Sequence, residues 1–135
     1  EAERIAEMKI EALDDMKEAA RRIHAMGCRS VLVKGGHALG DAVDVLFDGT
    51  DFRLLEARRI DTKNTHGTGC TFSSAIASNL ALGHGVAGSA ERAKRYVTTA
   101  IEHALSIGKG HGPTHHFYDL YREGLRGTDG EEKRA

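Results

Sequence analysis

The feature that most constrains the fold of this chain is a loop in which Gly67 and Gly69 flank Thr68 directly before a helical stretch. Glycines let the backbone adopt conformations closed to other residues, and they let a ligand approach without a Cβ in the way. The first amides of a helix have no partner inside it, so together with the helix dipole they attract anions. The loop predicts an anion site, although Gly-x-Gly alone is at least as consistent with a plain loop-to-helix turn.

Cys70 adds chemistry to this loop because it falls at the N-terminus of the expected helix. The helix dipole favours the thiolate over the thiol at such a position. A thiolate there could act as a nucleophile or as a proton acceptor. The alternative interpretation is that Cys70 is a small buried apolar residue, as free cysteines often are.

The rest of the chain shows helical patterns, then a strand with a two-stranded excursion, then paired helices, which indicates an α/β fold. Apolar spacing and turn residues predict helices over residues 1–9, 13–26, 70–82, 90–107 (with Ser89 as its cap) and 117–125. They predict strands over residues 30–34, 43–47 and 52–60, the last two joined by a hairpin turn at 48–51. An α/β sandwich needs more strands than these, so we expect one part of a larger sheet. The N-terminus looks like a cut within a helix, and residues 126–135 look disordered.

Composition excludes several classes of function. The 19 basic and 20 acidic residues leave a net charge of -1, which gives no reason to expect a nucleic-acid partner. No apolar run approaches the roughly 20 residues that a membrane span needs. The two cysteines, Cys28 and Cys70, show neither a disulfide framework nor zinc spacing. A reducing, cytoplasmic setting is therefore expected.

Four stretches resemble, in order, the motifs of hydroxymethylpyrimidine/phosphomethylpyrimidine kinases of thiamine biosynthesis, which are members of the ribokinase superfamily. They are Val31–His37, Asp44–Gly49, Asp61–Ala77 and Gly108–Phe117. The resemblance covers about residues 1–122. It implies a ribokinase-like three-layer α/β/α sandwich, of which residues 1–125 form the C-terminal, phosphate-binding and catalytic part and residues 126–135 a tail.

The resemblance also implies an activity and a set of site residues. The activity is ATP-dependent phosphorylation of 4-amino-5-hydroxymethyl-2-methylpyrimidine and then of its monophosphate, with ATP and Mg²⁺ as cofactors. Backbone amides of the anion hole would hold the transferring phosphoryl group, and Cys70 would replace the usual aspartate as catalytic base. The anion hole comprises Gly67, Thr68, Gly69 and Cys70.

Further ATP contacts are expected outside the anion hole. Lys34 matches the family lysine that contacts the transferring phosphates, and it ends a strand, where ligands gather in α/β sheets. Thr65, His66 and Lys109 are expected near the nucleotide, with His66 orienting the loop and Lys109 equally consistent with simple solvation. Glu1 corresponds to a family glutamate linked indirectly to Mg²⁺, and no direct metal ligand is expected.

Two other interpretations stay open. The chain could derive from a related pyridoxal or pyridoxine kinase, which shares the Gly-Thr-Gly-Cys chemistry. It could also be a non-catalytic unit for folding or dimerisation. The arginines Arg53, Arg58 and Arg59 are interpreted as a solvated strand face rather than a phosphate site. Because part of a sheet exposes an apolar edge and face, we expect self-association into a homo-oligomer.

Overall fold

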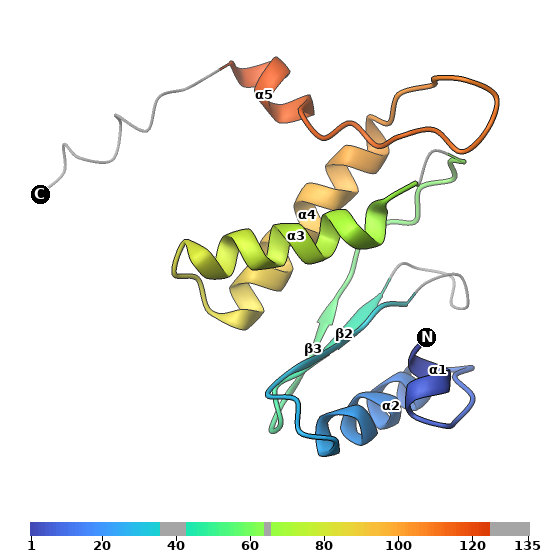
Figure 1. The fold of residues 1–135 in the computed structure, drawn as a ribbon, viewed down its shortest axis with the longest axis vertical. Coiled ribbons are helices and arrows are strands. Elements are labelled where there is room, and N and C mark those ends of the chain that lie inside the picture. The colour runs from blue at the N-terminus through green and yellow to red at the C-terminus, as the bar shows by residue number, and fades with distance from the viewer. Residues whose placement is uncertain (36–42, 64–65, 125–135) are drawn as a thin grey trace, which may run out of the picture.

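The computed structural model describes residues 1–35, 43–63 and 66–124 (Figure 1). Along these residues two helices precede a run of three strands and three helices follow it, and the predicted α/β class is confirmed. In chain order the elements are α1 (Ala2–Ile5), α2 (Leu13–Ala25), β1 (Val31–Val33), β2 (Asp44–Phe47), β3 (Phe52–Leu55), α3 (Thr68–Ala81), α4 (Val86–Glu102) and α5 (Tyr118–Glu123).

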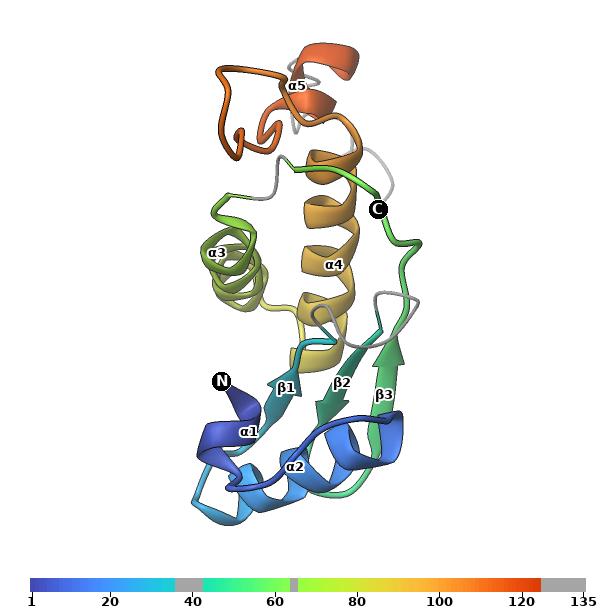
Figure 2. The ribbon, with the colours of Figure 1, turned by 90° about the vertical axis from the view of Figure 1, so that its right-hand side faces the viewer.

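The three strands form one antiparallel sheet in the order β1-β2-β3 (Figure 2). Val31 pairs with Phe47, and Val45 pairs with both Val33 and Leu54. A short turn at residues 48–51 connects β2 to β3, as predicted. Gly49 supplies the positive φ of 98° that this turn requires.

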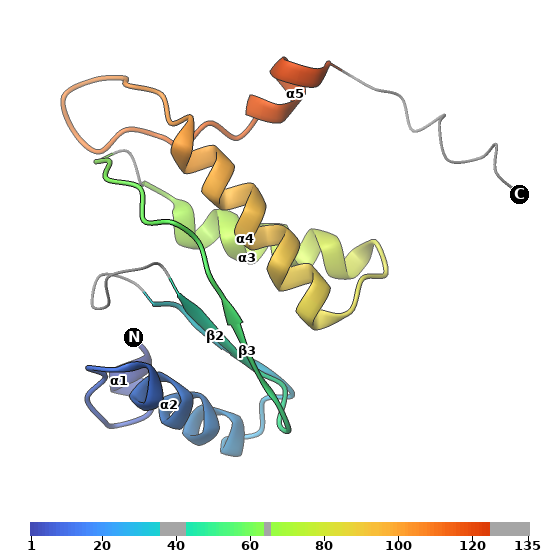
Figure 3. The same ribbon diagram turned by 180° about the vertical axis from the view of Figure 1, so that it is seen from behind.

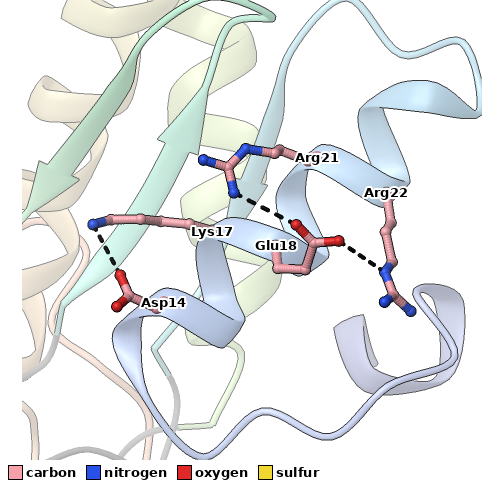
Figure 4. Close-up of polar contacts among 5 residues, drawn as sticks. All are labelled: Asp14, Lys17, Glu18, Arg21 and Arg22. Atoms are coloured by element: carbon pink, nitrogen blue, oxygen red, sulfur yellow. Dashed lines mark hydrogen bonds and ion pairs between the residues drawn. The ribbon is translucent and has the colours of Figure 1, made fainter.

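One face of the sheet packs on α2. Alternate strand residues point toward this helix, where Val33, Val45 and Phe47 bury their side chains against Met16 and Ala20. The exposed surface of α2 carries ion pairs at helical spacing (Figure 4). They are Lys17 with Asp14 at 3.3 Å, and Glu18 with Arg21 at 3.5 Å and Arg22 at 3.1 Å. The apolar stripe, not these exposed pairs, therefore fixes the position of α2.

The other face of the sheet is covered by α4, which in turn packs closely against α3 (Figures 1 and 3). Leu46 and Leu55 bury themselves against Ala90 of α4. Phe72 of α3 is buried against Ala93 and Val97 of α4. The described residues thus form three layers, with α2 on one side of the sheet and the α3–α4 pair on the other.

The structure corrects several predicted element boundaries. The first helix stops at Ile5 instead of residue 9, because the chain turns through Glu7 with a φ of 51°. The third strand ends at Leu55, where its pairing with Asp44 ends, instead of continuing to residue 60. The fifth helix covers Tyr118–Glu123 within the predicted 117–125.

The predicted capping role of Ser89 is wrong. Helix α4 begins at Val86 with Gly85 as its N-cap, so Ser89 already lies inside the helix. Its amide donates to the Gly85 carbonyl at 2.8 Å, and its buried hydroxyl donates to the His84 carbonyl at 3.4 Å. The helix also ends at Glu102 instead of residue 107.

The predicted tail at residues 126–135 lies outside the described residues, so the predicted domain boundary stays a prediction. Among the helices that the structure describes, none combines the length and apolar character required to cross a bilayer.

Candidate active site

The N-terminus of α3 is built by the glycine loop. Gly67 is the N-cap and adopts the left-handed conformation, with a φ of 79°. The carbonyl of Gly67 accepts hydrogen bonds from both the amide and the hydroxyl of Thr71, each at 2.9 Å. A Cβ on Gly69, in the first turn, would meet no atom within 4 Å. No side chain of the described residues caps α3 at Gly67, and the first amides of a helix have no partner inside it, so this helix end can take an anion.

A cleft of about 520 Å³ opens beside this helix end. Its walls come from the end of β1, the start of α3, the middle of α4 and the segment after β3. The lining residues are Lys34, Asp44, Thr68, Phe72, Lys94, Val97, Thr98, Ile101 and residues 57–62. Segments that are far apart in the sequence thus surround one space.

Lys34 reaches the start of α3 from the end of β1. Its Nζ lies 5.5 Å from the centroid of the Phe72 ring, which is within the range of a cation–π contact. Lys34 is exposed, so its ammonium remains accessible to a ligand in the cleft. The structure therefore brings Lys34 and Thr68 into one cleft, and their contact with phosphates stays a prediction.

Cys70 lies on a different side of α3. It is exposed, so the interpretation of a buried apolar cysteine is wrong. Cys70 lines a second pocket of about 560 Å³ together with Thr71, Ser74, Tyr96 and His116. The N-terminus of α3 thus separates two spaces, one containing Lys34 and one containing Cys70.

The loop before Gly67 is held by the chain after α4. His66 forms a parallel β-bridge with Pro113. The Nδ1 of His111 lies 2.9 Å from the carbonyl oxygen of Lys63, a hydrogen bond in the tautomer that carries a proton on Nδ1. These two contacts tie the segment before the glycine loop to the chain after α4, and the orienting role of His66 stays a prediction.

The other predicted site residues do not line the cleft or the second pocket among the described residues. Thr65 lies outside the described residues. Lys109 is exposed in the loop after α4, and the described residues that line the two pockets do not include it. Glu1 is exposed as the N-cap of α1, and the described part of the chain contains no group of three or more metal-ligating side chains. The indirect link from Glu1 to Mg²⁺ stays a prediction.

Two of the three arginines predicted to lie on a solvated strand face line the cleft instead. Arg58 and Arg59 come after the end of β3, so they do not lie on a strand, and both line the cleft with Lys34. Arg53 does lie on β3 and forms an exposed ion pair of 3.7 Å with Glu91. The apolar alternation of the strand pattern ends after Leu55, and this signal could have separated Arg53 on the strand from Arg58 and Arg59 beyond it.

An ion pair in the cleft wall was also missed. Asp44 and Lys94 contact each other at 2.7 Å, yet they stand 50 positions apart in the sequence. Asp44 belongs to the Asp44–Gly49 motif, so the sequence could have marked it as a residue of the site. Lys94 sits beside the apolar stripe of α4 and carries no signal of its own.

The three-layer arrangement is similar to that of a solved kinase. The ADP complex of Bacillus subtilis pyridoxal kinase superposes with a TM-score of 0.81 at 40% identity, covering 86% of this chain and 45% of that chain. The layers place the described residues in the ribokinase-like class of α/β folds, of which this chain covers a part.

Sequence comparison narrows this class to one family. A family model described as phosphomethylpyrimidine kinase matches residues 1–115. The bifunctional thiamine biosynthesis protein ThiED of Geobacter sulfurreducens is 55% identical over 117 residues, which are 86% of this chain and 24% of that protein. The hydroxymethylpyrimidine/phosphomethylpyrimidine kinase of Synechococcus elongatus is 46% identical over 123 residues, 90% of this chain and 47% of that enzyme. The chain belongs to the phosphomethylpyrimidine kinase family, and it spans less than half the length of these relatives.

Proposed function

We propose that the full-length protein uses ATP to phosphorylate 4-amino-5-hydroxymethyl-2-methylpyrimidine and then its monophosphate. The observation that carries the proposal is the shared cleft of Lys34 and the glycine-capped start of α3, in a chain of the phosphomethylpyrimidine kinase family. Phosphoryl transfer depends mostly on positioning and on stabilisation of charge, and this cleft offers both a cation and oriented amides.

The cleft suits the polyphosphate of a nucleotide. Lys34, Arg58 and Arg59 bring cationic side chains to its wall, while the first amides of α3 point outward at its edge. In the proposed complex, the amides of the anion hole hold the oxygens of the transferred phosphoryl group. Lys34 neutralises the charge on the adjoining phosphates, and ordered amides need no reorganisation as charge develops.

The residues of the cleft are compatible with Mg²⁺ that binds together with ATP. In phosphoryl-transfer sites the ion is commonly bound by nucleotide phosphates, waters and one or two carboxylates, not by an all-protein cage. Asp61 is the carboxylate that lines the cleft in addition to the ion-paired Asp44. When bound, the ion would supply charge neutralisation between the phosphates.

The second pocket suits the acceptor. The attacking and leaving oxygens lie roughly in line on opposite sides of the transferred phosphorus. Cys70 lines the pocket on the other side of the α3 N-terminus from Lys34, so it is placed on the acceptor side if ATP occupies the cleft. In the first reaction, Cys70 accepts the proton of the hydroxymethyl group.

The setting and assembly belong to the same proposal. The two thiols, Cys28 and Cys70, are both free and exposed, which accords with work in a reducing cytoplasm. A homo-oligomer is proposed because apolar side chains of the described residues remain on the surface.

The test uses the purified full-length product of the gene that encodes this chain. It is supplied with ATP, Mg²⁺ and one of four acceptors: the hydroxymethylpyrimidine, its monophosphate, pyridoxal or pyridoxine. Mass spectrometry of the products should show conversion of the pyrimidine to the monophosphate and of the monophosphate to the pyrophosphate. Absence of both pyrimidine products would overturn the proposal.

Pyridoxal kinase activity is the second candidate. It is favoured by the TM-score of 0.81 to Bacillus subtilis pyridoxal kinase. A kcat/KM for pyridoxal above that for the pyrimidine would establish it. The remaining interpretation is a non-catalytic unit for folding or dimerisation. Titration of this chain alone with a fluorescent ATP analogue separates that interpretation from the two kinases, because a non-catalytic unit would bind no nucleotide.

A further inference from the structure

A buried ion pair in the cleft wall joins the sheet to α4. We propose that Asp44 and Lys94 are a positioning pair, which holds the end of β1 and the middle of α4 at the spacing that the nucleotide needs. The inference rests on the proposed function, because it assigns the pair to an ATP cleft. The pair sets the shape of the cleft and takes no part in transfer of the proton or the phosphoryl group.

Asp44 uses both oxygens of its carboxylate. Oδ1 accepts a hydrogen bond from the amide of Gly35 at 2.9 Å, and Oδ2 contacts Nζ of Lys94 at 2.7 Å. Only 5% of the Asp44 side chain and 14% of the Lys94 side chain are exposed. Solvent and salt therefore screen this pair far less than a surface pair, and breaking it costs more than breaking a surface pair.

The bond to Gly35 transmits this constraint to Lys34, which is the preceding residue. A Cβ on Gly35 would collide with the backbone carbonyl of Val43, so the end of β1 and the start of β2 lie too close for any side chain there. Lys34 therefore leaves the sheet next to a residue, Gly35, that Asp44 binds while it also binds Lys94. Displacements of about 1 Å in a group that positions substrate can lower a rate about 100-fold.

A second ion pair between the sheet and α4 provides a matched control. Arg53 of β3 contacts Glu91 of α4 at 3.7 Å, with 59% and 51% of the two side chains exposed. This pair joins the same two layers, but neither residue lines the cleft. Glu91→Gln therefore removes an ion pair between sheet and α4 and leaves the cleft wall intact.

The experiment compares four variants of the full-length gene product. Lys94→Met removes the ion pair, and Asp44→Asn removes it while keeping an acceptor for the Gly35 amide. Asp44→Ala removes both contacts. The double variant Asp44→Asn/Lys94→Met removes both charges without leaving one buried, so it is expected to fold even if the single variants do not.

Three quantities are measured: the Kd of a non-hydrolysable ATP analogue, and the KM values for ATP and for the pyrimidine. We expect the Kd and the ATP KM to rise about tenfold in all folded variants, and further in Asp44→Ala, while the pyrimidine KM changes less than about twofold. Glu91→Gln should match the wild type. If the pair only stabilised the fold, the variants would unfold at a lower temperature, but the KM for ATP would not rise more than the KM for the pyrimidine.

Several outcomes would overturn the inference. They are a folded double variant that binds the analogue as tightly as the wild type, an equal rise in both KM values, or the same rise in Glu91→Gln. A wild-type protein that binds the analogue but phosphorylates no pyrimidine would overturn the proposed function, and the binding series would still decide the role of the pair. A wild-type protein that binds no nucleotide would overturn both.

Discussion

Cys70 is the residue on which the proposed chemistry depends most directly. The alcohol of the first acceptor must lose a proton, whereas a phosphate monoester near neutral pH is already largely anionic. We therefore expect Cys70→Ala to slow phosphorylation of the hydroxymethylpyrimidine by about 100-fold or more, as loss of a general base does, and to slow the second reaction much less. Single-turnover rates for each acceptor would measure this difference.

Cys28 supplies the control for this experiment, because it is the other exposed thiol and lies before β1, away from α3. Cys28→Ala should leave both rates unchanged. Equal losses in the two reactions for Cys70→Ala would contradict its assignment as the base.

The two loop glycines should respond differently to the same added methyl group. Gly67 has a φ of 79°, so Gly67→Ala is expected to cost about 1–2 kcal/mol of unfolding free energy. Gly69 lies in a helical turn with open space around a Cβ, so Gly69→Ala should change stability by less than about 1 kcal/mol. Its methyl group would instead stand over the proposed phosphate position and raise the ATP KM.

Urea denaturation and ATP kinetics on the full-length product would measure these two effects. The expected pattern is a large loss of stability for Gly67→Ala and a selective loss of ATP affinity for Gly69→Ala. Equal effects of both substitutions on stability would argue against the geometry of this helix start.

At the scale of elements, the turn between β2 and β3 gives a pH-dependent prediction. The amides of Asp51 and Thr50 donate to the Asp48 carboxylate at 2.8 and 2.9 Å, and these bonds lower the pKa of Asp48 below its ordinary value of 3.8. Because the folded pKa is the lower one, the stabilisation is complete above the unfolded pKa. It is lost as the pH falls through the folded value.

Asp48→Asn should therefore melt at a lower temperature than the wild type at pH 7, and the difference should shrink below about pH 4. Thermal unfolding followed by circular dichroism from pH 7 down to strongly acidic pH would measure it. Asp51→Asn is the control, since it makes the same charge change in the same turn. A difference that stays constant down to the lowest pH would contradict the role of the Asp48 carboxylate.

The sequence predicted the elements well where the pattern is local. The stripe of Met16 and Ala20 with Gly27 behind it placed α2 within one residue, and Asp48 with Gly49 placed the hairpin turn. The start of α4 was misplaced because Ser89 has the residue type of a cap but bonds within a turn that Gly85 already begins. A serine pattern alone does not separate these two positions.

At the scale of the whole molecule, exposed apolar side chains predict association. Leu82 is 76% exposed, Tyr121 75% and Ile107 61%. Large apolar side chains left on the surface favour contacts between molecules. We expect this chain on its own to show, by light scattering, a mass above its 14.6 kDa that grows with concentration. A constant mass of one chain over the whole range of concentration would contradict the prediction.

The fold class followed from sequence because amphipathic helices stand on both sides of a run of apolar strands in the chain, and a layered α/β fold buries the apolar faces of both. The cleft did not follow, because its walls come from segments that only the tertiary fold brings together. The Asp44–Lys94 pair spans 50 positions and has no periodicity, and the roles of Arg58 and Arg59 depend on where β3 stops pairing. Motifs in the sequence identified Lys34 and the glycine loop. The structure added Arg58, Arg59 and the Asp44–Lys94 pair to the cleft.

The separation of the two pockets by the start of α3 has a consequence for the design of inhibitors. A compound that fills only the cleft at Lys34 would compete with the donor, which the kinases of this class are proposed to share. Such a compound should inhibit pyrimidine and pyridoxal kinases alike. A selective compound would have to extend past Gly69 into the pocket at Cys70, where an electrophilic group could also capture the exposed thiol.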